Sequence, residues 1–157
     1  MKKLLSIILV LMLALTLMTS CGNNEQKQPV SEGPKASGEG IFPAIAKEDI
    51  KVGVIHIGNP ADGSGYSYAH DQGIIAMQKA LGLSDSQIIR KNNVSDTDPT
   101  ATEAAMLECI EEGANIIFGT SWGYMDTMEA LAQEYPDVIF SHGSGYKSND
   151  RNFNNYS

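Results

Sequence analysis

The chain has 157 residues, a formal net charge of -8 and 42% hydrophobic residues. An acidic chain without a basic stripe is a poor match for nucleic acid or for an anionic membrane surface, so neither is predicted as a partner by charge. Residues 51–157 are enough for one small domain and too few for two.

The first twenty residues have the order of an export signal. Lys2 and Lys3 precede an apolar run, residues 4–18, that is shorter than the ~20 residues a membrane-spanning helix needs. Small residues then precede Cys21, an order that resembles the bacterial lipobox, where a signal peptidase cuts and the cysteine receives a lipid. We therefore expect residues 1–20 to be a lipoprotein signal peptide. The alternative is a plain anchor helix that ends at a chance cysteine.

The segment after Cys21 is polar and rich in glycine. Residues 22–40 contain no aromatic residue, and Val30 is their one large aliphatic residue. Such a segment cannot bury enough apolar surface to offset its chain entropy. The sequence therefore predicts a disordered tether over residues 21–48, which would hold a folded lobe, residues 49–157, on the extracytoplasmic face of the cell membrane.

From residue 51 onward, short apolar strands alternate with helical patterns. Strands are predicted at residues 51–57, 87–94, 115–119 and 138–141, and helices at residues 68–83, 101–112 and 125–135. Thr100 and Glu103 fit a capping box that would begin the second helix, with Pro99 just before it. The alternation predicts an α/β fold, a Rossmann-like parallel sheet with helices on both faces.

In such a sheet, ligands bind beyond the carboxyl ends of the strands. This rule selects residues 58–68, 120–126 and 141–146, which are rich in glycine, serine and aromatic residues and suit a planar polar ligand. In the first stretch, Asp62 is predicted to accept hydrogen bonds from ribose hydroxyl or base N–H groups, and Tyr66 to stack on a ring. The alternative is that Asp62 and its neighbour Ser64 cap the next helix.

The other two stretches add four candidate residues. Trp122 is the only tryptophan of the chain, and it is either a stacking platform or a plug of the core beneath its loop. Ser121 precedes it, and Asp126 either reaches the ligand or caps its own helix. His142 is the histidine expected at the edge of the site.

Signatures of catalysis and of metal or cofactor binding are weak. Gly63 and Gly65 begin a dinucleotide fingerprint, but Tyr68 stands where its third glycine belongs. A set of Ser64, His142 and Asp62 lacks the sequence elbow that presents a nucleophilic serine. The sequence therefore predicts no enzyme, no cofactor and no metal. Cys109 lies in a helical apolar pattern, which favours a buried, inert thiol over a reactive one.

Four stretches together resemble the basic membrane protein family, which comprises solute-binding lipoproteins of ABC importers and is similar to purine nucleoside receptors. They are residues 51–54, 62–73, 119–126 and 135–143. The resemblance implies a type I periplasmic-binding fold with two lobes, a purine nucleoside or nucleobase as ligand, and ABC permease subunits as partners.

The resemblance also places residues in the ligand loops. Asp62 matches the acidic residue of the first loop, and Tyr66 matches the stacking aromatic residue after an insertion within residues 63–65. Ser121 and Trp122 match the second loop.

The resemblance reaches Ser157, and residues 152–156 resemble the approach to the hinge. The family's second lobe would be missing, through a truncated gene or a partial chain, so the chain alone should bind its ligand weakly.

A ligand-sensing surface lipoprotein without a transport role is an alternative function, and a nucleoside-acting enzyme is a less favoured one.

Overall fold

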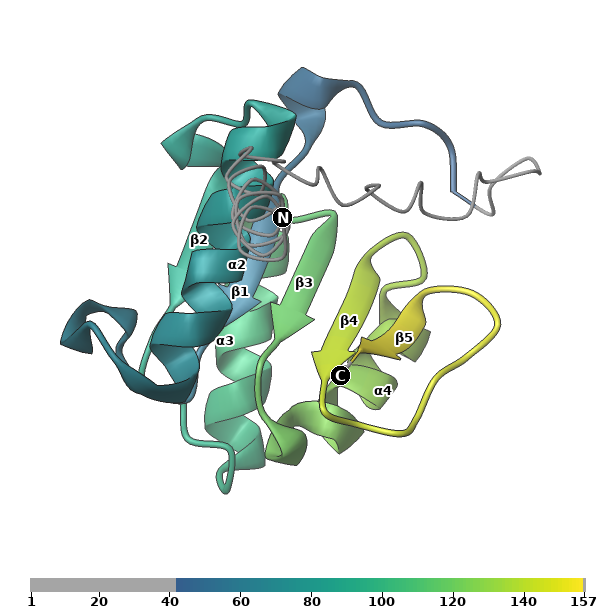
Figure 1. The fold of residues 1–157 in the computed structure, drawn as a ribbon. Coiled ribbons are helices and arrows are strands. Elements are labelled where there is room, and N and C mark those ends of the chain that lie inside the picture. Colours follow the sequence, from purple (N-terminus) through teal and green to yellow (C-terminus); the bar gives the residue numbers. More distant parts are fainter. Residues whose placement is uncertain (1–41, 157) are drawn as a thin grey trace, which may run out of the picture. The chain divides into compact units, whose positions relative to one another are not determined.

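The computed structural model describes residues 42–156 (Figure 1). The predicted signal peptide, the lipid on Cys21 and the tether up to residue 41 lie outside these residues. Within them, no helix is both long and apolar enough to cross a membrane.

Within the described residues, five parallel strands form one sheet in the order β2-β1-β3-β4-β5 (Figure 1). The strands are β1 (Val52–Ile55), β2 (Ile88–Lys91), β3 (Ile116–Gly119), β4 (Ile139–Gly143) and β5 (Phe153–Tyr156). Val52 of β1 is in register with Ile88 on one side and Ile116 on the other. The predicted parallel α/β sheet is confirmed.

Three α-helices cover the two faces of this sheet in the described part of the chain (Figure 1). They are α2 (Gly65–Leu81), α3 (Pro99–Glu111) and α4 (Met125–Glu134). Ile74 of α2 packs with Val52 and Val54 on one face. α3 and α4 pack on the other face, as expected for crossover connections between parallel strands.

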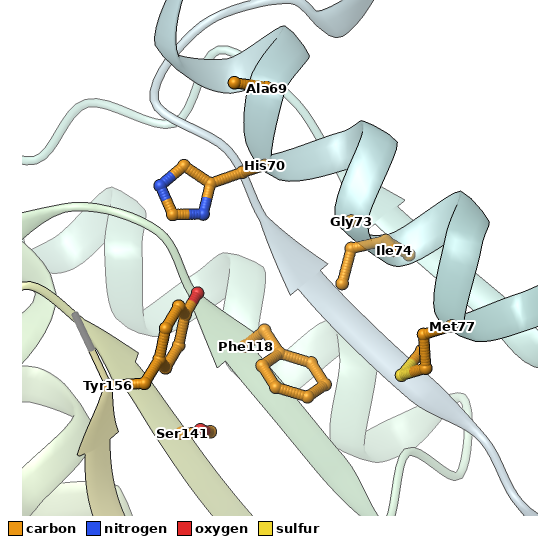
Figure 2. A pocket seen from close by; sticks show the side chains of 8 residues that line it. All are labelled: Ala69, His70, Gly73, Ile74, Met77, Phe118, Ser141 and Tyr156. Atoms are coloured by element: carbon orange, nitrogen blue, oxygen red, sulfur yellow. The ribbon is translucent and has the colours of Figure 1, made fainter. Parts of the chain in front are cut away.

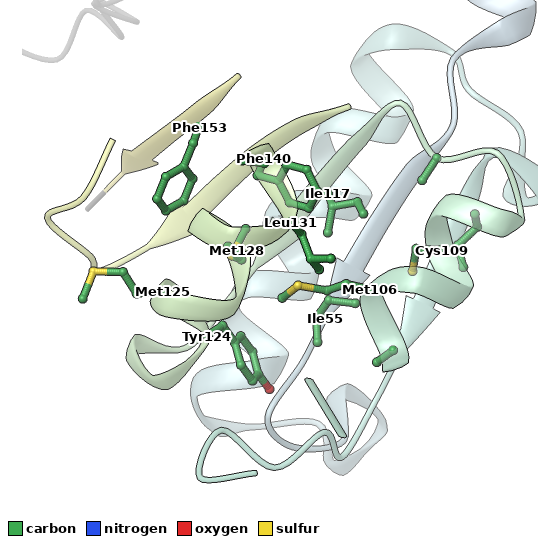
Figure 3. Close-up of a cluster of buried hydrophobic side chains, with 14 residues drawn as sticks. Ile55, Met106, Cys109, Ile117, Tyr124, Met125, Met128, Leu131, Phe140 and Phe153 are labelled. Atoms are coloured by element: carbon green, nitrogen blue, oxygen red, sulfur yellow. The ribbon is translucent and has the colours of Figure 1, made fainter. Parts of the chain in front are cut away.

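The larger core lies between the sheet and the pair α3 and α4 (Figure 3). Ile117 and Phe140 of the sheet contact a cluster that includes Met106 and Leu131 of the helices. Cys109 is buried in this cluster, and burial raises the pKa of its thiol to about 12. The predicted burial of Cys109 is confirmed, and at neutral pH the sulfur stays protonated and a poor nucleophile.

The start of α3 corrects one prediction. Asp98 is the N-cap residue, and its carboxylate accepts the backbone N–H groups of Thr100 and Ala101 at 3.1 and 3.2 Å. The predicted capping box at Thr100 is therefore wrong. Pro99 occupies the first helical turn, where its fixed φ suits the helix and its missing N–H costs nothing, so the helix begins two residues before the predicted position.

The last strand was not predicted. The residues interpreted as the approach to a hinge form β5, which pairs in parallel with β4. Asn152 fixes the start of this strand, because its side-chain amide donates to the carbonyl oxygens of Ala132, Tyr135 and Val138 at 2.8, 3.1 and 2.8 Å. The carbonyls of Ala132 and Tyr135 lie at the end of α4, where helical partners run out, and that of Val138 lies just before β4.

The last residues of the predicted tether contact the lobe. Lys47–Asp49 forms a short 3-10 turn, and the side-chain amide of Gln87 donates to the carbonyl oxygen of Lys47 at 2.8 Å. The contacts of the lobe therefore reach back to Lys47 in the described residues, and the boundary at residue 49 stays a prediction.

Candidate ligand-binding site

The loop after β1 brings Tyr66 to the carboxyl edge of the sheet. Gly63 and Gly65 have φ values of 74° and 85°, in the left-handed region that glycine tolerates and other residues rarely adopt. The backbone N–H of Gly58 donates to the Ser67 hydroxyl at 2.9 Å, which ties the loop to the first turn of α2. Helix α2 begins at Gly65, three residues before the predicted start, and Tyr66 lies in its first turn.

The capping alternative for this loop is not what the structure contains. Ser64 is at the N-cap position of α2, but its side chain makes no capping hydrogen bond. Asp62 ends the 3-10 turn Pro60–Asp62 and is exposed. Its predicted role as an acceptor for a ligand stays a prediction.

Tyr66 contributes to a small cavity at this edge. Its side chain is 49% exposed, and its ring lies 4.4 Å from the ring of His70 at an interplanar angle of 56°. Together with Ser144 and Tyr156, these two residues line a cavity of about 230 Å³. Burial raises the pKa of Tyr156 to about 12, so its phenol stays a neutral hydrogen-bonding group. The start of α2 thus meets the ends of β4 and β5.

Trp122 presents a second aromatic face to solvent. It begins the 3-10 turn Trp122–Tyr124 after β3, and its side chain is 56% exposed. Its ring lies 5.7 Å from the ring of Tyr146 at an interplanar angle of 49°. The alternative that Trp122 plugs the core is wrong, because the buried ring of this loop is that of Tyr124.

Asp126 lies in the first turn of α4 without capping it. The N-cap position belongs to Tyr124, and the Asp126 carboxylate lies 2.8 Å from the ammonium of Lys147. The same ammonium lies 2.6 Å from the Glu129 carboxylate. Lys147 was not among the predicted site residues, and no local sequence pattern pairs it with residues about twenty positions earlier.

Ser121 and His142 are both buried. The hydroxyl of Ser121 donates to the Asp96 carboxylate at 2.6 Å, and Nε2 of His142 lies 2.7 Å from the Ser121 carbonyl oxygen. Burial lowers the pKa of His142, so its ring is neutral and its proton sits on Nε2, facing the carbonyl. The predicted ligand contacts of Ser121 and His142 stay predictions, and in this conformation both residues contact protein atoms.

A wider groove runs beside α2 (Figure 2). It encloses about 430 Å³ and is lined by Ala69, His70, Gly73, Ile74, Met77, Phe118, Ser141 and Tyr156. His70 and Tyr156 border both this groove and the smaller cavity. The sequence predictions missed the groove. Its only local signal is that Ala69, Gly73 and Met77 recur every four residues on one side of α2.

A chain of polar groups lies beneath the ligand loops. Nε2 of His56 lies 3.4 Å from the Asp71 carboxylate, which also accepts from Nε of Arg90 at 2.7 Å. Nδ1 of His56 faces the Thr120 hydroxyl at 3.4 Å, but that buried hydroxyl donates to the Ile55 carbonyl at 2.9 Å. The group therefore joins strand ends to α2 and does not present a free nucleophile.

The described residues also contain no group of three or more His, Cys, Asp or Glu side chains that could hold a metal ion. The arrangement at this edge consists of exposed aromatic faces, the carboxylates of Asp62, Asp126 and Glu129 and the ammonium of Lys147, supported by buried polar contacts. Such groups can stack on and hydrogen-bond to a ring with polar substituents.

Comparison with a solved structure agrees with the fold. An ABC transporter solute-binding protein from Aeropyrum pernix K1 superposes with a TM-score of 0.56 at 15% identity, covering 68% of this chain and 28% of that chain. The parallel sheet and its helices therefore have the same fold as part of that protein.

The family follows from the sequence comparisons. Residues 50–157 match the family described as Bmp, ABC transporter substrate-binding protein PnrA-like, so the chain belongs to this family. A purine-binding protein of Brucella abortus (strain 2308) is 38% identical over 107 residues, covering 68% of this chain and 29% of its own length. A Haloferax volcanii protein, named as a candidate ABC transporter glucose-binding protein, is 31% identical over 86 residues, covering 55% of this chain and 21% of its own length.

Proposed function

We propose that this chain is part of an extracytoplasmic solute receptor that binds a purine nucleoside or nucleobase and delivers it to an ABC permease. The single observation that carries the proposal is the pair of exposed aromatic rings, Tyr66 and Trp122, at the carboxyl edge of the sheet. Aromatic side chains that face solvent at this edge can stack on a flat ring, and a purine supplies one.

Hydrogen-bonding groups beside these rings support a ligand with polar substituents. Asp62 follows β1 on the first ligand loop and is exposed, so its carboxylate is free to accept from ribose hydroxyls or base N–H groups. Asp126 is held by Lys147 at the edge of the second loop. The name of the Brucella relative points to purines, whereas that of the Haloferax relative points to a sugar.

The proposed location rests on the first residues of the chain. Signal-like residues 1–20 and a lipid on Cys21 would place the receptor on the outer face of the cell membrane. The chain spans 29% and 21% of the length of its two relatives, so the remaining contacts to the ligand and the permease would come from further segments. With part of the site, the chain alone should bind with a Kd of about 1 mM.

Saturation-transfer NMR detects binding of this strength and tests the ligand class. The chain is mixed with adenosine, guanosine, inosine, adenine or hypoxanthine, with glucose as the alternative ligand. We expect saturation transfer to the purine ring protons and little to glucose. Transfer to glucose alone would contradict the proposal, and so would conversion of a nucleoside to products, which would favour the enzyme alternative.

The matched substitutions compare the two proposed stacking residues with an exposed residue away from the site. Tyr66→Ala and Trp122→Ala should each weaken purine binding by roughly three- to tenfold, the worth of one aromatic contact. Leu81→Ala is the control, because Leu81 is 51% exposed at the other end of α2. Equal binding by all three variants would refute the assignment of the site.

A further inference from the structure

The turn that carries Trp122 alternates buried anchors with one exposed ring. Ser121, Tyr124 and Met125 are buried, whereas the Trp122 side chain between them is 56% exposed. The hydroxyl of Tyr124 donates to the carbonyl oxygen of Val94 at 2.6 Å. Tyr124, on the carboxyl side of Trp122, thus attaches the turn to the segment after β2.

The other side of Trp122 is held at two points. The Ser121 hydroxyl donates to the Asp96 carboxylate at 2.6 Å, and the Ser121 carbonyl oxygen accepts from Nε2 of His142 at 2.7 Å. One residue next to the exposed ring is therefore bonded to the segment after β2 and to the end of β4. A hydrogen bond to a charged carboxylate is stronger than one between neutral groups.

Gly145 holds the His142 ring from its other edge. A methyl group placed on Gly145 would overlap the imidazole at Nδ1. Nδ1 is buried and has no hydrogen-bond partner among the described residues, so the ring is oriented by its bond to Ser121 and by the Gly145 backbone.

We propose that Asp96, Ser121 and His142 form a clamp that positions the Trp122 ring for its ligand, as positioning residues that do not themselves touch it. The clamp rests on the proposed function only in assigning a ligand to Trp122. It deepens that function, because it makes the second aromatic face of the site a fixed surface, and a preformed surface binds with less loss of conformational entropy.

Trp122 reports on the clamp directly, because it is the only tryptophan in the chain. Time-resolved fluorescence anisotropy of the full chain without ligand measures rotation of its ring. Ser121→Ala and His142→Ala should each raise the amplitude of the nanosecond rotation about twofold, as expected when an anchored turn becomes a mobile loop. In His142→Gln this amplitude should stay as low as in the unaltered chain, because the glutamine amide can donate to the Ser121 carbonyl oxygen.

Two further variants separate the clamp from general loosening. Ser141→Ala is the matched control, because Ser141 is 7% exposed like Ser121 and donates to the Asn154 side-chain oxygen at 2.8 Å outside the clamp. Gly145→Ala displaces the His142 ring without removing a hydrogen-bonding group and should act like His142→Ala. Thermal melting by circular dichroism verifies that each variant is folded.

The outcomes distinguish the clamp from the proposed function. The clamp is supported if the amplitude of the nanosecond rotation of the Trp122 ring rises in Ser121→Ala, His142→Ala and Gly145→Ala. In Ser141→Ala and His142→Gln this amplitude should stay as in the unaltered chain. Equal rotation in Ser121→Ala and Ser141→Ala overturns it. In purine titrations of the same variants, unchanged affinity despite a mobile ring overturns its role in binding. Absence of purine binding by the unaltered chain refutes the proposed function and leaves the anisotropy result as evidence for the clamp as a loop anchor.

Discussion

At the scale of single residues, the site separates side chains that face solvent from those that hold them. Tyr66 and Trp122 are about half exposed, whereas Ser121, which precedes Trp122, and His142, which contacts Ser121, are buried. The sequence predicted all four as ligand contacts, from their places after strand ends and, for Ser121, from the family resemblance. Sequence alone could not separate the two roles, since a bond such as that between Ser121 and Asp96 joins residues 25 positions apart.

The buried histidines predict how stability depends on pH. Burial lowers the pKa of His56 and His142 below 6.5 in the folded chain. The unfolded chain therefore binds protons more readily, so the stability held above pH 6.5 is lost as the pH falls below it. Each histidine contributes up to about 1.4 kcal/mol per pH unit in this range.

Urea unfolding at pH 7.5, 6.5 and 5.5 measures this dependence. His142→Gln removes one of the three histidines whose pKa burial lowers, the others being His56 and His70, so the loss of unfolding free energy between pH 6.5 and 5.5 should be smaller than in the unaltered chain. The same loss in both proteins would contradict the burial of a neutral His142 ring.

At the scale of elements, strong periodic patterns were predictable and weak ones were not. The β-branched run of β1 and the Gly82 stop of α2 have clear signals, and both elements were expected. β5 was missed because Asn154 and Asn155 are unfavourable in strands, and only pairing with β4 and burial of Phe153 make this segment extended.

The cap of α3 gives a test at this scale. Asp98→Ala removes the carboxylate that accepts from Thr100 and Ala101, and should lower the free energy of unfolding by about 1 kcal/mol. Glu103→Ala removes one negative charge from the same end of the helix and tests the capping box that the structure does not contain. In chemical denaturation, the free energy of unfolding of Glu103→Ala should stay close to that of the unaltered chain. A larger loss in Glu103→Ala than in Asp98→Ala would contradict the assignment of the cap.

At the scale of the whole molecule, the fold fits a family whose relatives are several times longer than the matched region. The chain covers 29% of the Brucella relative, so its lobe presents one side of the proposed site. Enclosure by the rest of such a receptor would bury most of a ligand's surface, as small-molecule sites do. The sequence predicted this family and fold because strand ends and ligand-loop motifs coincide in the same stretches.

Attachment to the membrane is a prediction for the whole molecule. In cells supplied with labelled palmitate, the chain should take up the label, because Cys21 follows a signal-like segment. Cys21→Ala should abolish labelling, whereas Cys109→Ala should keep it, since Cys109 is buried in the core. Label that survives Cys21→Ala would contradict the lipoprotein assignment.

The most direct test of the central claim uses the indole N–H of Trp122, which gives a single indole signal in a proton–nitrogen NMR spectrum because the chain has one tryptophan. During titration with inosine or adenosine, this signal should shift progressively and saturate at millimolar concentrations, and Tyr66→Ala should weaken the response. A signal that stays in place while purine binds elsewhere, or that responds to glucose and not to purines, would contradict a purine site at the carboxyl edge of this sheet.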